Sequence, residues 1–125
     1  MKKLLTLFLF LNFCTIYAQK IENMVVLGDC SGACEINIQN AKALDSLYIK
    51  HEIAPNASVY QFVFTVMAGM NSYSEAVKGT SKLTPKMKAT LSKIKPGDKI
   101  IIDLIKIKFQ TGKLKDSRGI TLTVK

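Results

Sequence analysis

Alternation of apolar and polar side chains predicts strands along most of the chain. Residues 59–67 (VYQFVFTVM) are apolar on both faces, which is typical of a central strand in a packed sheet. Residues 99–109 (KIIIDLIKIKF) begin with both faces apolar and end with lysine on one of them, so part of this strand should face water. Residues 120–124 (ITLTV) alternate strictly. Shorter runs predict further strands at residues 21–27, 35–40, 46–53 and 73–76.

Turn-forming residues separate these runs. Glycine, proline, asparagine and aspartate favour turns because they adopt or stabilise turn conformations. Residues 110–113 (QTGK) predict a hairpin turn, and residues 115–119 (KDSRG) predict a second turn or a bulge. Residues 41–45 (AKALD) fit either a helical turn or a loop. Further interruptions are predicted at residues 28–34 (GDCSGAC) and 54–58 (APNAS).

One short helix is predicted, at about residues 85–94. The hydroxyl of Thr84 can accept from the first free N–H groups, and Pro85 suits the first helical position. Pro96 and Gly97 end the helix, because proline cannot continue it and glycine supplies the turn. The apolar side chains of this helix form one narrow stripe, which consists of Met87, Leu91 and Ile94.

The number and spacing of these elements predict the fold class. About seven short strands with a single short helix indicate a mainly β protein, an antiparallel β-sandwich. Residues 19–125 are 125 − 18 = 107 residues, a length that fits one domain with a two-layer core.

The first eighteen residues have the pattern of a secretory signal peptide. A basic MKK precedes an apolar core that ends in Ala18, and cleavage is expected between Ala18 and Gln19. The alternative is an uncleaved anchor, but an apolar run of about 15 residues is shorter than the roughly 20 that span a bilayer. The sequence therefore predicts a bacterial protein exported to the periplasm or the exterior, with no membrane span after cleavage.

Charge is distributed unevenly between the two halves of residues 19–125. Residues 19–75 contain three lysines and six acidic residues (3 − 6 = −3), whereas residues 76–125 contain twelve lysines, one arginine and three acidic residues (13 − 3 = +10). Export argues against nucleic acid, and so does the lack of aromatic residues that could stack on bases, since Phe109 alone follows Tyr73. An acidic protein, an anionic envelope polymer and a merely solvated surface remain as interpretations.

The lysines around the predicted helix and the following strand are the candidate contact surface. They border the apolar stripe of the helix on both sides and continue on the polar face of residues 99–109. Their long aliphatic stems can also cover apolar surface while the charge stays in water. This predicted basic face consists of Lys86, Lys88, Lys93, Lys95, Lys106 and Lys108.

The remaining chemistry-bearing residues predict no enzyme. Cys30 and Cys34 are expected to form a disulfide in an exported chain, with a reduced or a redox-active pair as alternatives. Two cysteines and one distant histidine, His51, cannot supply the four ligands of a zinc site. A lone histidine on a strand is more often structural than catalytic. No catalytic residue, metal ligand or cofactor is therefore assigned.

The C-terminal half resembles a known family. Leu83-Thr84-Pro85-Lys86-Met87, the turn Lys95-Pro96-Gly97-Asp98 and the strand Asp103-Leu104-Ile105-Lys106-Ile107-Lys108 follow in the order and spacing of the C-terminal domain of GldM. GldM is a gliding-motility and type IX secretion protein of Bacteroidetes. The resemblance covers roughly residues 62–125, including Gly79, Gly112 and the final strand. It departs at residues 109–112 (FQTG), where the family hairpin tends to read Gly-Pro-Asp-Gly, and in lacking the domains that precede this one in GldM.

The resemblance implies an immunoglobulin-like β-sandwich and a non-enzymatic role in contacting proteins of the cell envelope. Together with the charge distribution it predicts a partner with an acidic surface. The alternative hypothesis is a binding module for anionic envelope glycans or lipid headgroups, and a third is an accessory protein without a discrete site.

Overall fold

A computed structural model describes residues 25–50 and 56–125 of the chain. These residues form eight strands and two helices. The strands are β1 (Val25–Leu27), β2 (Ala33–Ile36), β3 (Leu47–Ile49), β4 (Ser58–Ala68), β5 (Asn71–Lys78), β6 (Lys99–Lys108), β7 (Leu114–Ser117) and β8 (Ile120–Val124). The helices are α2 (Ile38–Lys42) and α3 (Pro85–Ser92).

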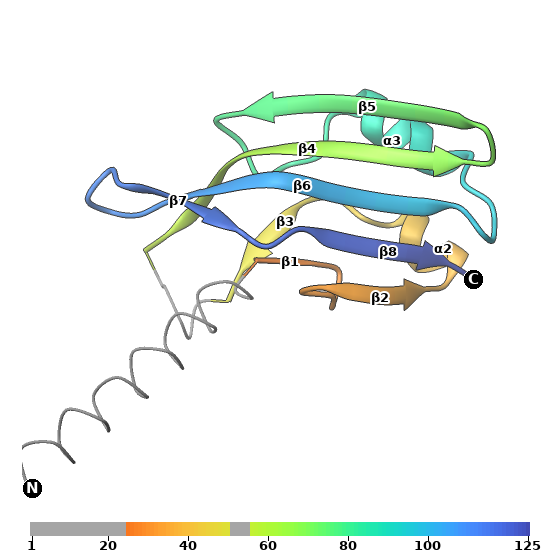
Figure 1. Cartoon of the computed structure of the whole chain (residues 1–125), viewed down its shortest axis with the longest axis horizontal. Coiled ribbons are helices and arrows are strands. Elements are labelled where there is room, and N and C mark those ends of the chain that lie inside the picture. Colours follow the sequence, from red (N-terminus) through yellow and green to blue (C-terminus); the bar gives the residue numbers. More distant parts are fainter. Residues whose placement is uncertain (1–24, 51–55) are drawn as a thin grey trace, which may run out of the picture.

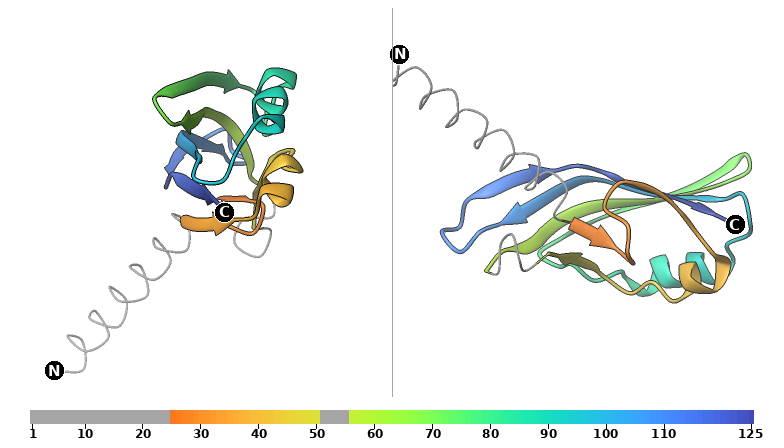
Figure 2. Two further views of the ribbon diagram at one scale, coloured as in Figure 1. Left: turned by 90° about the vertical axis from the view of Figure 1, so that its right-hand side faces the viewer. Right: turned by 90° about the horizontal axis from the view of Figure 1, so that it is seen from below.

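The strands form two layers of unequal size. A six-stranded sheet has the order β2-β8-β6-β4-β5, and β7 pairs with β6 beside β8. A two-stranded sheet of β1 and β3 lies on one side of it, together with α2 and α3 (Figures 1 and 2). The predicted fold class, mainly β with a sandwich-like arrangement, is therefore confirmed.

Several elements differ from the sequence prediction. β2 pairs in parallel with β8, whereas the prediction was entirely antiparallel. The strand predicted at residues 35–40 ends at Ile36, because the Asn37 side chain accepts a hydrogen bond from the Asn40 N–H (2.7 Å) and starts α2. Residues 115–117, predicted as part of a second turn or a bulge, instead belong to β7, because the hairpin brings residues 114–117 into register with the end of β6.

The helix prediction is confirmed to within two residues. α3 begins at Pro85, and the Thr84 hydroxyl accepts a hydrogen bond from the Met87 N–H at 3.2 Å. The helix ends at Ser92 with Lys93 as its C-cap, rather than at residue 94. Its stripe packs as predicted, since Met87, Leu91 and Ile94 are all buried.

The core lies between the inner face of the six-stranded sheet and the second layer. Its buried residues form one cluster to which the two layers both contribute. The largest fully buried side chains are Phe62, Phe64, Leu27, Leu47, Met87, Leu91, Ile100, Ile102, Ile105, Ile107 and Ile120. Burial of apolar area on this scale is the main favourable term in folding.

Bulges interrupt the pairing of β4 with β6. The register shifts between Val59 and Gln61 and again between Gln61 and Val63. In the second shift β6 contributes one residue more than β4, and Leu104 adopts a positive φ of 49°. Such bulges bend a strand and increase its twist. The sheet is curved in Figure 2, and both Asp103 and Leu104 are exposed.

A polar cluster joins β5 to the start of α3. The Tyr73 hydroxyl donates a hydrogen bond to Glu75, and the Thr84 hydroxyl donates another to the same carboxylate oxygen at 3.0 Å. The hydrogen bond to Glu75, helped by partial burial and by the negative charge of Glu75, raises the pKa of Tyr73 to about 12 from its ordinary value of 10.0.

This shift predicts a late step in an alkaline titration. Tyr73 holds its proton more tightly in the folded chain, so its contribution to stability is complete below pH 10.0 and is lost as the pH rises through about 12. Ultraviolet absorbance of tyrosinate should show a late step that Tyr73→Phe removes and Tyr48→Phe keeps. Loss of that step in the Tyr48→Phe protein instead would contradict the assignment.

Candidate interaction surface

The outer face of the six-stranded sheet is uncovered by any element of the described ranges 25–50 and 56–125 (Figure 2). We call it the open face. It carries the side chains that alternate with the buried ones along each strand. One row across it consists of Ala33, Thr121, Ile101, Thr65 and Ser74. The next row consists of Glu35, Thr123, Lys99, Met67 and Ser72. Hydroxyl and apolar side chains therefore make up most of these two rows, and Glu35 and Lys99 are their charged members.

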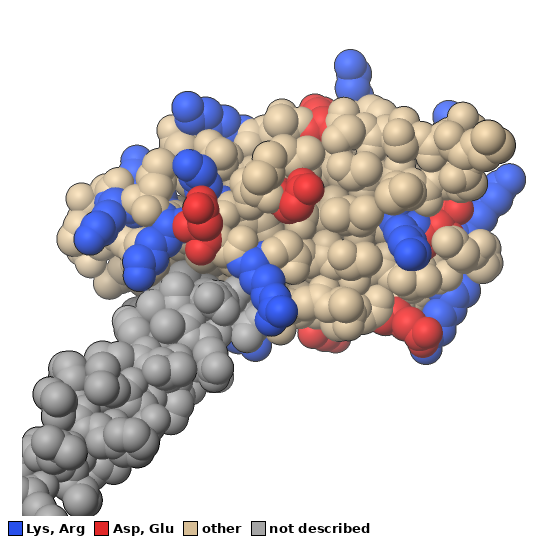
Figure 3. All heavy atoms as spheres, viewed as in Figure 1, with Lys and Arg blue, Asp and Glu red and all other residues tan. Residues whose placement is uncertain are grey.

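Charge lies mainly around the border of the open face. Figure 3 shows a middle that is largely uncharged, with a few acidic side chains and with lysine and arginine side chains mostly along the margins. The strand registers place four lysines on this face. They are Lys78, Lys99, Lys106 and Lys108. Few charges at the centre and more at a polar rim are one feature of protein-binding surfaces.

Tyr60 and two lysines form a distinct cluster at one end of the open face. The Lys108 Nζ lies 5.4 Å from the centroid of the Tyr60 ring, and the Lys78 Nζ lies 5.8 Å from it. Both distances are within the range of a cation–π interaction. Lys106 is two residues away on the same face of β6, where it lies opposite Asp116 of β7. This end of the face is therefore basic.

The structure divides the six lysines of the predicted basic face into two groups. Lys106 and Lys108 lie near the C-terminal end of β6, on the open face. The other four, Lys86, Lys88, Lys93 and Lys95, belong to α3 and the turn that follows it, on the opposite side of the sheet (Figure 2). That turn leads into the N-terminal end of β6, and the ten residues of β6 span about 30 Å. The six lysines are therefore not one continuous surface.

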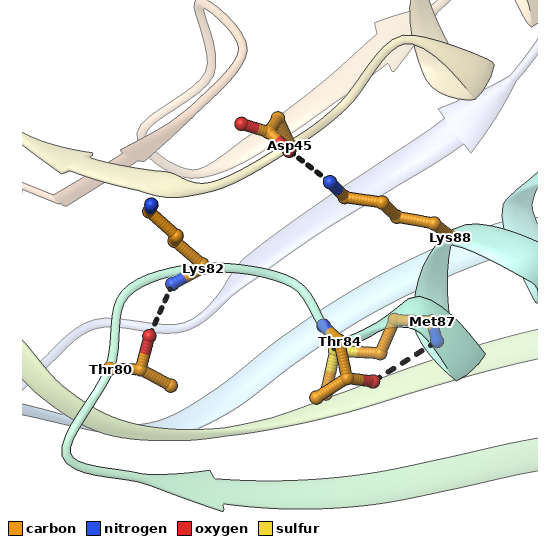
Figure 4. Close-up of polar contacts among 6 residues, drawn as sticks. All are labelled: Asp45, Thr80, Lys82, Thr84, Met87 and Lys88. Carbon is orange, nitrogen blue, oxygen red and sulfur yellow. Dashed lines mark hydrogen bonds and ion pairs between the residues drawn. The ribbon is translucent and has the colours of Figure 1, made fainter.

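One of the α3 lysines has a structural partner. The Lys88 ammonium pairs with Asp45, which precedes β3, and so links α3 to the segment before β3 (Figure 4). The hydrogen bond from Lys88, followed by its positive charge, lowers the pKa of the Asp45 carboxyl. Because the pair is half exposed, its contribution to stability is small; it is present at neutral pH and is lost as the pH falls through the lowered pKa.

The segment that carries Lys82 is fixed by hydrogen bonds on both sides. The Leu83 N–H donates to the Asp45 carbonyl at 2.8 Å, and the Leu47 N–H donates to the Ser81 carbonyl at 2.8 Å. The Lys82 N–H also donates to the Thr80 hydroxyl at 3.0 Å (Figure 4). These bonds attach the segment that precedes α3 to β3 and to the residues before it.

Cys30 and Cys34 form a disulfide, as predicted from export, with their sulfur atoms 2.06 Å apart. The bridge closes the loop between β1 and β2 and borders an open groove of about 600 Å³. The groove is also lined by Asn37 and Asn40 of the start of α2 and by Lys125. Lys125 pairs with Glu35 at 2.9 Å, so its charge is already compensated there.

Residues 25–50 and 56–125 contain no group of three or more His, Cys, Asp or Glu side chains placed to hold a metal ion. No helix in these ranges is long and apolar enough to cross a membrane. The interpretation of His51 as a structural histidine falls outside the described residues.

No protein-family model matches the chain, and no curated protein matches it either. The resemblance of residues 62–125 to the GldM C-terminal domain therefore stays a prediction from the residues.

Sequence reasoning did not single out Tyr60, Lys78 or Lys99. The strand near Lys78 was predicted too short, at residues 73–76, whereas β5 extends to residue 78. The strict alternation of residues 120–124 could have indicated the hydroxyl groups of the open face. It places Thr121 and Thr123 on one face of the strand and three buried apolar residues on the other.

Proposed function

We propose that this protein is an exported, non-enzymatic module that binds another envelope protein with an acidic surface. The proposal rests on the open face, a broad sheet surface that no described element covers, with a largely uncharged middle and four lysines. Positive charge at the margins would steer an acidic partner and fix its orientation, and hydroxyl and short apolar groups would form the centre of the contact.

The proposed contact surface keeps only two of the six lysines of the predicted basic face. Lys106 and Lys108 remain contact residues, and Lys78 joins them because it lies beside Tyr60 on the same end of the open face. The α3 lysines serve solubility and, at Lys88, the attachment of the helix. The resemblance to the GldM domain supports the role of a protein-contacting module in the envelope.

The test compares two triple charge reversals of equal size. One variant replaces Lys78, Lys106 and Lys108 with glutamate, and the control replaces Lys86, Lys93 and Lys95. The chain 19–125 is used to capture partners from an envelope extract, and the captured protein is then purified for affinity measurements at low and high salt. We expect the open-face variant to weaken binding about tenfold or more, and the control to change it far less.

Equal losses in both variants would mean that only net charge matters, and an unchanged affinity of the open-face variant would reject this contact surface. Lys88 is omitted from the control because its reversal would break the pair with Asp45. Circular dichroism of both variants establishes that neither has lost its fold.

A second candidate function has its own observation. Tyr60 between Lys78 and Lys108 provides an aromatic ring and two cations within 5.8 Å of its centre. This arrangement suits the anionic groups of a glycan or a lipid headgroup. If the module works in this way, the chain 19–125 should bind sulfated glycans or anionic vesicles without a protein partner, and Tyr60→Ala should reduce that binding.

A further inference from the structure

β5 is the one long strand of the six-stranded sheet that is paired along a single edge. It pairs with β4 from Asn71 to Lys78 without a register shift, and no other strand among the described residues pairs with it. It forms the upper border of the sheet in Figure 1, with α3 behind the sheet rather than beyond the edge (Figure 2). Unpaired edges of this kind are templates for pairing with another chain.

The register identifies the backbone groups that point away from the molecule. The Gly79 N–H donates to the Tyr60 carbonyl, so Tyr60 and Gly79 are a hydrogen-bonded pair of the antiparallel ladder. Hydrogen-bonded pairs alternate with non-bonded ones. The backbone groups of the odd-numbered residues of β5 therefore face β4. Those of the even-numbered residues face outward, and these residues are Ser72, Ser74, Ala76 and Lys78.

The opposite edge of the sheet lacks these properties. β2 and β7 are four residues long, against eight for β5. β2 is preceded by the disulfide-closed loop and followed directly by the Asn37 cap of α2. Short edge strands and bulges are the usual means of preventing edge pairing, and β5 has neither a bulge nor a proline.

We propose that β5 pairs with β5 of a second copy of this chain, in antiparallel orientation about a two-fold axis at Ser74. In a two-fold antiparallel pairing, residues whose backbone groups face outward must lie opposite residues of the same kind. The two-fold axis can therefore pass through Ser74, Glu75 or Ala76 if most of the strand is to be paired. Each of these three registers brings different side chains opposite one another.

Charge decides between the registers. An axis at Glu75 places the two Glu75 carboxylates directly opposite each other, which is unfavourable. An axis at Ala76 brings the two Lys78 residues within about 14 Å along the strands, whereas an axis at Ser74 separates them by about 27 Å.

The edge itself favours a second copy of this basic chain as the occupant. β5 contains one acidic and one basic residue, Glu75 and Lys78, in a chain whose residues 19–125 carry 16 basic and nine acidic residues. Two copies can therefore meet along β5 without bringing together the basic ends of their open faces, where Lys78, Lys106 and Lys108 lie. The residues near the axis whose backbone groups face outward, Ser72, Ser74 and Ala76, have small side chains on the open face, which permit close approach of the two strands.

Pairing in this way would have a functional consequence. The two six-stranded sheets would become one continuous sheet of twelve strands, with both open faces on the same side. A partner that presents two acidic surfaces could then be bound twice, and the second contact would be intramolecular. The pairing itself does not depend on what the open face binds.

Engineered cysteines test the register directly, in the chain 19–125, whose own cysteines are the disulfide-bonded Cys30 and Cys34. With the axis at Ser74, two Ser74→Cys residues face each other with Cα atoms about 5.5 Å apart, within the range of a disulfide. Ala76 faces Ser72 of the other copy. Ser74→Cys should therefore cross-link to itself, Ala76→Cys alone should not, and an equal mixture of Ser72→Cys and Ala76→Cys should form a mixed dimer.

A second pair of variants tests the edge without cysteine chemistry. Ser74→Pro removes an outward N–H that β4 does not use, so the fold should persist while the dimer dissociation constant rises about tenfold or more. Ser74→Ala keeps the N–H and should dimerise like the parent chain. Sedimentation equilibrium measures both.

Two results would overturn the proposal. The first is a parent chain that stays monomeric up to about 1 mM. The second is cross-linking of Ala76→Cys alone with a yield equal to that of Ser74→Cys.

Discussion

Replacing Phe64 with alanine is expected to lower the free energy of unfolding by about 3–5 kcal/mol, which is the usual cost of removing a fully buried phenylalanine side chain. Phe64 is completely buried on β4, between β5 and β6. Its ring centre lies 6.5 Å from that of Tyr73 in an edge-to-face arrangement. The loss would be a large share of the roughly 5–15 kcal/mol that stabilises an ordinary domain.

The matched control is Phe109→Ala, the same chemical change at a partly exposed position just after β6. Urea unfolding followed by circular dichroism measures both variants, since the chain has no tryptophan for fluorescence. We expect a clearly smaller loss for Phe109→Ala. Equal losses would mean that β4 is not the centre of the core.

The sequence was most informative where the local pattern and the tertiary environment agree. The strands predicted at residues 59–67 and 99–109 correspond to β4 and β6, because their side chains are buried in the middle of the sheet. The strand predicted at residues 120–124 matches β8. The capped helix starts at the predicted residue, because Thr84 and Pro85 act locally.

Prediction failed where distant contacts, or a local side-chain cap that competes with a strand, decide the structure. β7 has no apolar alternation and is a strand only because the hairpin aligns it with β6. β2 ends early because a local side-chain cap at Asn37 competes with the strand, and its parallel pairing with β8 joins segments about 90 residues apart, a contact that no short-range signal encodes.

The candidate contact surface shows the same limit. Lys95 and Lys106 are close in sequence but lie on different sides of the sheet and at different ends of the molecule. The turn before β6 separates the sides, and the length of β6 separates the ends. Lysines distant in sequence, Lys78 and Lys108, meet at the Tyr60 ring because β5 and β6 both flank β4. Clustering along the sequence therefore grouped lysines that the fold separates, and it did not single out Lys78, which the fold places beside Tyr60.

The asymmetry of the sheet connects the fold to the proposed function. The inner face requires the second layer, because its isoleucine and phenylalanine side chains must be buried. The open face carries hydroxyl, charged and scattered apolar side chains, a mixture that tolerates water. A surface of this kind can be covered and uncovered by a partner without loss of the core. The stability of the module should therefore depend on the inner layer, and its binding on the open face.

Leu91→Ala should show how far the sheet depends on that inner layer, with an expected loss of about 2–5 kcal/mol. Leu91 is fully buried and is one of two buried residues within α3. A helix of eight residues is marginal in isolation, so its packing against the sheet has to maintain it. Hydrogen exchange should accelerate most at the Lys88 N–H, which bonds to the Thr84 carbonyl in the first turn of α3.

Leu104→Ala is the control, because it removes the same atoms from a side chain that is 70% exposed. Its effect should stay within about 0.5 kcal/mol, as is usual for surface substitutions. Urea unfolding of the two variants gives the comparison. If Leu91→Ala costs no more than Leu104→Ala, α3 does not hold the inner layer in place, and β1, β3 and α2 must carry that role without it.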